Sequence, residues 1–262
     1  MQDLTKYLKE LHLMKDAPHL EQLLLRLENE KNEGMTVRGL LTEVLGSICQ
    51  HRRDKRTLTW TTTACFPKRF TTPFDMQLSN IPVKRVEELL VCDWIGRSEN
   101  LLMCGPSGLG KTHLAVAIGK QAISKGYRTR FADACQLFQG LSKAMLIALS
   151  VYEKKLQSLD TLDLLILDDM GNGTVPAEAG NFFYEIMNRR YDKGLSTIIT
   201  TNKAVSSWGK ALGDSTSVRA GLDRFLETAY KLKFAGKSLR LESFNRRNQL
   251  NIQDTEEAVS KE

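Results

Sequence analysis

The clearest chemical signature in this 262-residue chain is a glycine-rich loop that ends in a lysine and a threonine. Residues 105–112 read GPSGLGKT, which matches the phosphate-binding pattern G-x-x-x-x-G-K-[ST]. Glycines allow the φ values with which backbone N–H groups curl around an anion. Lys111 is expected to reach the β- and γ-phosphates of ATP, and the Thr112 hydroxyl is expected to bind Mg²⁺. The predicted nucleotide contacts are Gly105, Pro106, Ser107, Gly108, Leu109, Gly110, Lys111, Thr112 and His113.

The residues on either side of this loop form the pattern that a phosphate site needs. An apolar run at 101–104 is typical of a buried strand, and Leu114, Ala115 and Ile118 follow the loop at helical spacing. A helix that begins at the loop adds unpaired N–H groups and a partial positive charge. This context favours a nucleotide site over the alternative, a glycine-rich turn that arose by chance.

Two adjacent acids form the second chemical signature. Residues 163–169 read DLLILDD, an apolar strand that ends in two carboxylates. Asp168 is expected to hold Mg²⁺, directly or through water, and Asp169 is expected to orient the attacking water. The alternative is that these acids only cap the next helix. The phosphate-binding loop earlier in the chain favours the catalytic interpretation.

A third polar residue follows another segment that is expected to be a buried strand. Residues 196–201 read STIITT, and Asn202 comes directly after them. An amide at this place is suited to position a water or to sense the γ-phosphate, although an asparagine at a strand end is also common in turns. The guanine-reading pattern N-K-x-D is excluded, because position 205 is Val.

The remaining pattern predicts an α/β core with helices around a buried sheet. Helices are expected at 83–94, 177–191 and 218–228, and further strands at 127–132 and 231–234. The expected organisation is an N-terminal helical domain (1–56), a connector (57–82), an ATPase domain (83–250) and a flexible acidic tail (251–262). The connector prediction depends on the run TLTWTTT at 57–63, whose β-branched residues are poor helix formers.

The charge distribution bears on the binding partner, and the cysteine content bears on the cellular compartment. The net charge is +6, and residues 51–70 alone contain six Lys or Arg against one Asp. A second basic zone at 182–250 suggests a polyanion such as nucleic acid, although a solvated basic surface is an equal alternative. The five cysteines show no C-x-x-C spacing, which favours free thiols in a reducing cytoplasm. Neither a membrane span nor a signal peptide is expected.

Together these segments resemble the AAA+ ATPases of the IstB/DnaC type, which comprise helper ATPases of insertion sequences and bacterial helicase loaders. The resemblance covers residues 66–247 well and the N-terminal helices weakly. The runs that carry it are GPSGLGKTHLAVAIG (105–119), LLILDDMG (164–171), TIITTN (197–202), GLDRFL (221–226) and GKSLR (236–240).

The resemblance implies a five-stranded parallel sheet of order 5-1-4-3-2 and ATP–Mg²⁺ bound between neighbouring subunits of a homo-oligomer. It implies that Asn202 is sensor I, that Arg224 is an arginine finger and that Arg240 is a sensor-II-type arginine. The chain departs from the family at Asp169, where Glu is frequent. It also departs at TLTWTTT, where the family has a basic helix.

The expected function is that of an ATP-dependent transposition helper. It would oligomerise on duplex DNA without sequence preference and deliver target DNA to a transposase. The nearest alternative is a DnaC-like loader of a replicative helicase. A small-molecule kinase is disfavoured, because no credible set of acceptor-binding residues is found. A nucleotide-gated DNA scaffold that scarcely hydrolyses ATP also remains, because Asp169 is one methylene shorter than Glu.

Overall fold

This computed structural model describes residues 8–9, 12–29, 36–76, 80–213, 215–242 and 244–245. The chain forms two compact units, Met1–Trp60 and Thr61–Glu262. The predicted acidic tail at 251–262 lies outside the described residues. No helix within the described ranges combines the length and the apolar composition that crossing a bilayer requires.

The first unit is helical, as was expected for the N-terminal residues. A short 3₁₀ turn η1 (Met14–Asp16) leads into α2 (Ala17–Asn29), and α3 (Val37–Thr63) follows. Leu20 of α2 packs with Ile48 of α3 in a small core. Beside this core, the buried Asp16 carboxylate forms a 2.7 Å ion pair with Arg52. A core of this size buries little apolar area, so the unit has little stability of its own.

The expectation that a connector begins at TLTWTTT is wrong, because α3 continues through Thr63. The helical penalty of threonine is only a few tenths of a kcal/mol, and extending an existing helix requires no new nucleus. The Thr59 hydroxyl also donates to Lys55 O at 2.9 Å, within its own helix. The helix ends where Cys65 adopts a φ of 60° and Ala64 O accepts from Phe131 N at 2.7 Å.

The second unit is built on a sheet of five parallel strands. Its order is β2-β3-β4-β1-β5, which is the predicted order 5-1-4-3-2 read from the other edge. The strands are β1 (Asn100–Cys104), β2 (Thr129–Asp133), β3 (Leu164–Asp168), β4 (Ser196–Thr201) and β5 (Ala229–Lys233).

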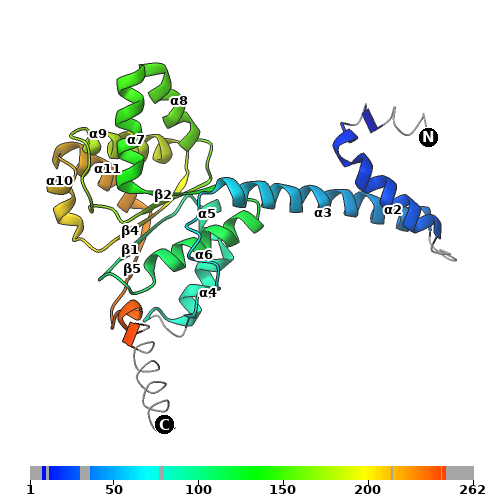
Figure 1. Cartoon of the computed structure of the whole chain (residues 1–262), viewed down its shortest axis with the longest axis horizontal. Coiled ribbons are helices and arrows are strands. Elements are labelled where there is room, and N and C mark those ends of the chain that lie inside the picture. The colour runs from blue at the N-terminus through cyan, green and yellow to red at the C-terminus, as the bar shows by residue number, and fades with distance from the viewer. Residues whose placement is uncertain are drawn as a thin grey trace, which may run out of the picture. The chain divides into compact units, whose positions relative to one another are not determined.

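Helices cover both faces of this sheet, so the central strands are apolar on both sides (Figure 1). The helices are α4 (Val83–Val91), α5 (Asp93–Gly96), α6 (Lys111–Ser124), α7 (Ala134–Ile147), α8 (Leu149–Leu159), α9 (Ala179–Asp192), η3 (Val205–Ser207), α10 (Trp208–Ala211) and α11 (Ser215–Glu227). Leu101 and Met103 pack with α4 and α6 in one core, whereas Leu102 packs with α7, α9 and α11 in the other.

The predicted helix at 83–94 is interrupted. Cys92 adopts a φ of 63°, which ends α4 and starts the short helix α5. The predicted strand at 196–201 matches β4, and the bounds of the other predicted elements differ from the structure by at most three residues at either end.

The parallel arrangement gathers the carboxyl ends of all strands at one edge of the sheet. Cys104 of β1 lies in register with Thr201 of β4, and Asp133 of β2 with Asp168 of β3. The glycine-rich loop that leaves β1 therefore lies at the same edge as the acids that end β3. This edge is where ligands bind in open α/β sheets.

Candidate nucleotide-binding site

The glycine-rich loop has a backbone that only glycine accommodates well. Gly105 has a φ of 146°, and any side chain at this position would collide with the carbonyl oxygen of Phe234. Gly110 has a φ of 88° and is the residue from which α6 begins. The first turn of α6 therefore directs its unpaired N–H groups at the loop, as phosphate binding requires.

Lys111 folds over the loop from the start of α6. Its ammonium donates to the carbonyl oxygens of Gly105 at 2.6 Å and of Pro106 at 2.7 Å. Burial lowers the pKa of Lys111, and the nearby carboxylates of Asp169 and Asp168 oppose this shift. Phosphate oxygens are stronger acceptors than these carbonyls, so Lys111 is placed to exchange them for a bound nucleotide.

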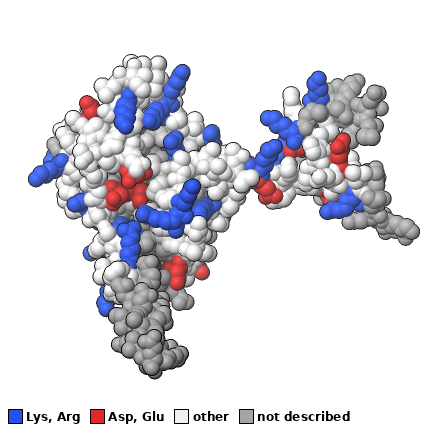
Figure 2. All heavy atoms as spheres, viewed as in Figure 1, with Lys and Arg blue, Asp and Glu red and all other residues white. Residues whose placement is uncertain are grey.

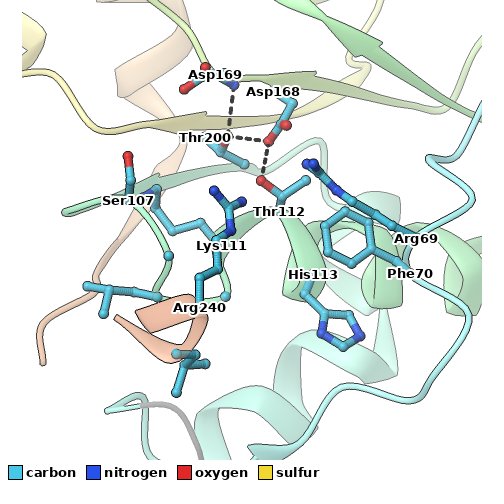
Figure 3. A pocket seen from close by; sticks show the side chains of 14 residues that line it. Arg69, Phe70, Ser107, Lys111, Thr112, His113, Asp168, Asp169, Thr200 and Arg240 are labelled. Carbon is cyan, nitrogen blue, oxygen red and sulfur yellow. Dashed lines mark hydrogen bonds between the residues drawn. The ribbon is translucent and has the colours of Figure 1, made fainter. Parts of the chain in front are cut away.

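Asp168 is the most constrained acid of the site (Figure 3). Its Oδ1 accepts from the Thr112 hydroxyl at 2.8 Å and from the Thr200 hydroxyl at 2.6 Å. Burial raises the pKa of Asp168, while these two hydroxyl bonds act in the opposite direction. The donor set of one carboxylate and one hydroxyl consists of hard oxygen ligands, so Thr112 and Asp168 suit Mg²⁺.

Thr200 is a site residue that the sequence did not single out. It lies near the end of a buried strand and reads as one more β-branched strand former. In the structure it bridges the two acids, because its hydroxyl donates to Asp168 and accepts from the Asp169 N–H at 3.0 Å. The parallel pairing of β3 with β4 creates this contact.

The structure brings Asp169 and Asn202 together through a residue between them. Asn172 Nδ2 donates to Asp169 Oδ1 at 2.6 Å and to Asn202 Oδ1 at 2.7 Å. Asn202 Nδ2 donates to the Ser107 hydroxyl at 3.0 Å. The acid, the strand-end amide and the loop therefore form one chain of hydrogen bonds. Sequence reasoning treated Asn172 only as part of a turn.

The glycine-rich loop from Ser107 onward, the two acids and Thr200 line a cavity of about 380 Å³. Arg69 and Phe70, which the sequence analysis missed, form one side of it (Figure 3). The His113 ring stacks on Phe70 with centroids 5.1 Å apart and makes a 3.0 Å hydrogen bond with Thr72 O. The only sequence signal for Phe70 was its position beside cations in a segment that reads as irregular.

The two predicted arginines lie in different places. Arg240 lines the cavity, and its charge acts on Lys111. Arg224 does not line the cavity. Its guanidinium lies over the Tyr184 ring, 5.2 Å from the centroid, and donates to Ala220 O at 3.2 Å. The described residues therefore do not bring Arg224 into the site of its own subunit.

A phosphate-binding loop, a strand-end aspartate that accepts from its threonine, and this order of parallel strands define an ATP-binding P-loop protein of the AAA+ class. The chain is matched over residues 6–247 by the family described as "IstB-like ATP binding protein", and it belongs to that family.

Comparison with individual proteins agrees with this assignment. The chain is 37% identical over 162 residues to the ATP-binding protein of insertion sequence IS5376 from Geobacillus stearothermophilus, which covers 62% of this chain and 63% of that protein. It is 39% identical over 158 residues to the corresponding protein of IS21 from Pseudomonas aeruginosa, covering 60% and 58%. These matches span less than two thirds of either relative. An IS21-like protein from Bacteroides fragilis matches at 26% identity over 97% of this chain and 94% of its own length.

Solved structures show the same fold. The DnaC helicase loader superposes with a TM-score of 0.53 at 25% identity, covering 64% of this chain and all of that one. DnaI superposes with a TM-score of 0.54 at 18% identity, covering 65% of this chain and 95% of that one.

Proposed function

We propose that this protein is a Mg²⁺-dependent ATPase that acts on DNA as a transposition helper. The observation that carries the ATPase proposal is the arrangement of Thr112, Asp168 and Thr200 next to Lys111. A hydroxyl and a carboxylate 2.8 Å apart provide oxygen ligands for a divalent ion beside the phosphate-binding loop. Bound Mg²⁺ would supply charge stabilisation for phosphoryl transfer at this position.

The other residues of the site have separate roles in this proposal. Lys111 holds the β- and γ-phosphates. Asp169 orients the attacking water, and Asn202 senses the γ-phosphate from its position beside Ser107. Arg240, at the rim of the cavity, adds positive charge near the phosphates.

The site is completed by a second copy of the chain in this proposal. Phosphoryl transfer gains from a cation that faces the developing charge, and Arg224 lies outside the cavity of its own subunit. An arginine finger that acts on a neighbouring subunit also lies outside the cavity of its own subunit. The proposed assembly is therefore a homo-oligomer with nucleotide bound between subunits.

DNA is the proposed partner because of charge and family context. Relatives of this chain are ATP-binding proteins of insertion sequences. On one face of the second unit, Lys and Arg side chains lie around a small acidic area (Figure 2). Exposed Lys and Arg of this kind bind phosphates without reading bases. The oligomer would hold duplex DNA and pass it to a transposase.

Duplex binding at a series of salt concentrations tests the DNA proposal. We expect affinity to fall linearly in log–log form, with a slope of about −0.9 per phosphate neutralised, and to be equal for unrelated sequences. The matched control is the same titration without nucleotide. Without nucleotide the protein should bind DNA more weakly, because the proposed assembly requires ATP. Salt-insensitive or strongly sequence-selective binding would contradict the proposal.

A helicase loader is the second candidate function. The observation in its favour is the superposition with the DnaC helicase loader at 25% identity over the whole of that chain. Pull-down of the purified protein with ATP and DNA separates the candidates. Capture of a transposase supports the helper, and capture of the replicative helicase supports the loader.

A further inference from the structure

The loop after β3 connects the acid of the site to the phosphate-binding loop through one side chain. Both N–H donors of the Asn172 amide are used, one on Asp169 Oδ1 and one on Asn202 Oδ1. Asn202 continues the chain to the Ser107 hydroxyl. Since Asn172 occupies Oδ1 of Asp169, it orients that carboxylate and leaves Oδ2 to accept from a water.

The backbone of this loop is held in uncommon conformations. Asp169 has a φ of 60°, a left-handed conformation that costs a non-glycine residue about 1–2 kcal/mol. Gly171 and Gly173 have φ values of 84° and 79°. Contacts of the Asn172 side chain and of the Asp169 N–H with Thr200 hold this conformation in place.

The far side of the same loop contacts α7. Thr174 O accepts from Cys135 Sγ at 3.0 Å and from Gln139 Nε2 at 3.0 Å. A side chain at Gly173 would press on the Cys135 side chain, so the loop and the helix are in close contact. A rearrangement of this loop at the nucleotide site would therefore change the contacts at the start of α7.

A tryptophan with an unpaired donor packs beside the loop. Among the described residues, Trp208 Nε1 is the only buried side-chain nitrogen or oxygen without a hydrogen-bond partner. Leaving such a donor unpaired costs about 1–3 kcal/mol. The Trp208 ring packs beside Gly171, where a Cβ would lie 3.4 Å from Trp208 Cδ1.

We propose that Asn172 is a positioning residue that orients Asp169 for hydrolysis and transmits nucleotide binding from Asn202 to the loop at 171–174. A γ-phosphate is a stronger acceptor than the Ser107 hydroxyl and competes for the Asn202 N–H groups. Its binding changes the hydrogen bonds of Asn172, and the loop against Trp208 and α7 moves with it. The hydrolysis part of this inference rests on the proposed ATPase function.

Steady-state kinetics test the positioning role. Asn172→Ala should lower kcat about ten- to hundred-fold, because a misplaced reacting group loses rate of this order, and should leave KM within about twofold. Asn172→Asp keeps the size of the side chain but removes its N–H donors, so its kcat should fall as much as that of Asn172→Ala while the protein folds normally. Asn188→Ala, which removes an Asn–Asp contact within α9, is the matched control and should behave as the wild type. Wild-type kcat in both Asn172 variants would overturn the positioning role.

Fluorescence tests the transmission independently of hydrolysis. The chain contains three tryptophans, so Trp60→Phe with Trp94→Phe leaves Trp208 as the only emitter. A non-hydrolysable ATP analogue should change its emission, and Asn172→Ala should abolish the change while the analogue still binds. No change in the parent, or an equal change in the variant, would overturn the transmission. A response that depends on Asn172 in a protein that releases no phosphate would keep the transmission and refute the ATPase instead.

Discussion

Among single residues, Asp168 is suited to bind a ligand but lowers the stability of the ligand-free protein, because its charge is buried. Its folded pKa is raised by burial, so the native state binds more protons than the unfolded chain between the two pKa values. The contribution of Asp168 to the free energy of unfolding therefore falls as the pH rises between these two pKa values. The cost of the buried charge remains at neutral pH. A metal ion with its nucleotide would offset the cost of the buried charge.

We predict that Asp168→Asn leaves the nucleotide-free protein at least as stable as the wild type at pH 7. The amide oxygen still accepts from Thr112 and Thr200, but no charge is buried. The difference in Tm should shrink as the pH falls through the raised pKa of Asp168, where the wild-type acid becomes protonated. Mg²⁺-dependent ATP binding should be lost. Thermal unfolding in chelator checks this, with the exposed Asp93→Asn as control. A lower Tm at pH 7 would contradict the prediction.

The sequence predicted the parts of the site that lie close together along the chain. Lys111 and Thr112 follow from the loop spacing, and Asp168 follows from the apolar run that it ends. Thr200 and Asn172 could not be predicted, because their roles depend on which strands lie side by side and on how one turn folds back. Roles across subunits, such as that proposed for Arg224, remain predictions.

Among the elements, α6 shows how closely the core surrounds the site. Gly119 of α6 packs against β3 and the segment after α3, and a Cβ there would lie 2.8 Å from Ile166 Cδ1 and from Phe66 Cε1. The helix that carries Lys111 therefore approaches the sheet as closely as a glycine allows.

We predict that Gly119→Ala destabilises the second unit by about 1–3 kcal/mol, because overpacking exceeds the gain of about 1 kcal/mol in helix propensity. Gly46→Ala is the matched control. Gly46 lies in α3 with open space around it, so alanine there should stabilise by about 0.5–1 kcal/mol. Denaturant unfolding measures both. A stabilised Gly119→Ala protein would show that the core has room at this position.

The helix α3 marks the limit of prediction from local propensity. TLTWTTT contains residues that are individually poor in helices, yet it continues a helix that is already formed. Sheet order, in contrast, was predicted correctly, because it follows from a family resemblance carried by several separate motifs. How far α3 extends depends on the helix that precedes TLTWTTT, and the composition of this run alone does not show it.

For the whole molecule, the proposed oligomer makes Arg224 act on a neighbour. We predict that Lys111→Ala and Arg224→Ala are each inactive and that mixing them restores part of the ATPase activity. A mixed interface joins the intact loop of one subunit to the intact finger of the other. Fingers of GTPase systems contribute about 10³–10⁵ in rate. Arg219 on the same helix is tested in parallel. If neither arginine variant loses activity, the shared site is refuted.

The most direct measurement is steady-state phosphate release in the presence of Mg²⁺ and duplex DNA, made together with ATP binding, for the wild type and Asp169→Asn. The amide retains the shape of the carboxylate but cannot polarise water, so the variant should bind ATP normally. Its release rate should fall by about 10²–10⁴-fold. Phosphate release by the wild type with this loss in the variant is the predicted result. No release by the wild type, or full turnover by Asp169→Asn, would contradict the proposed ATPase.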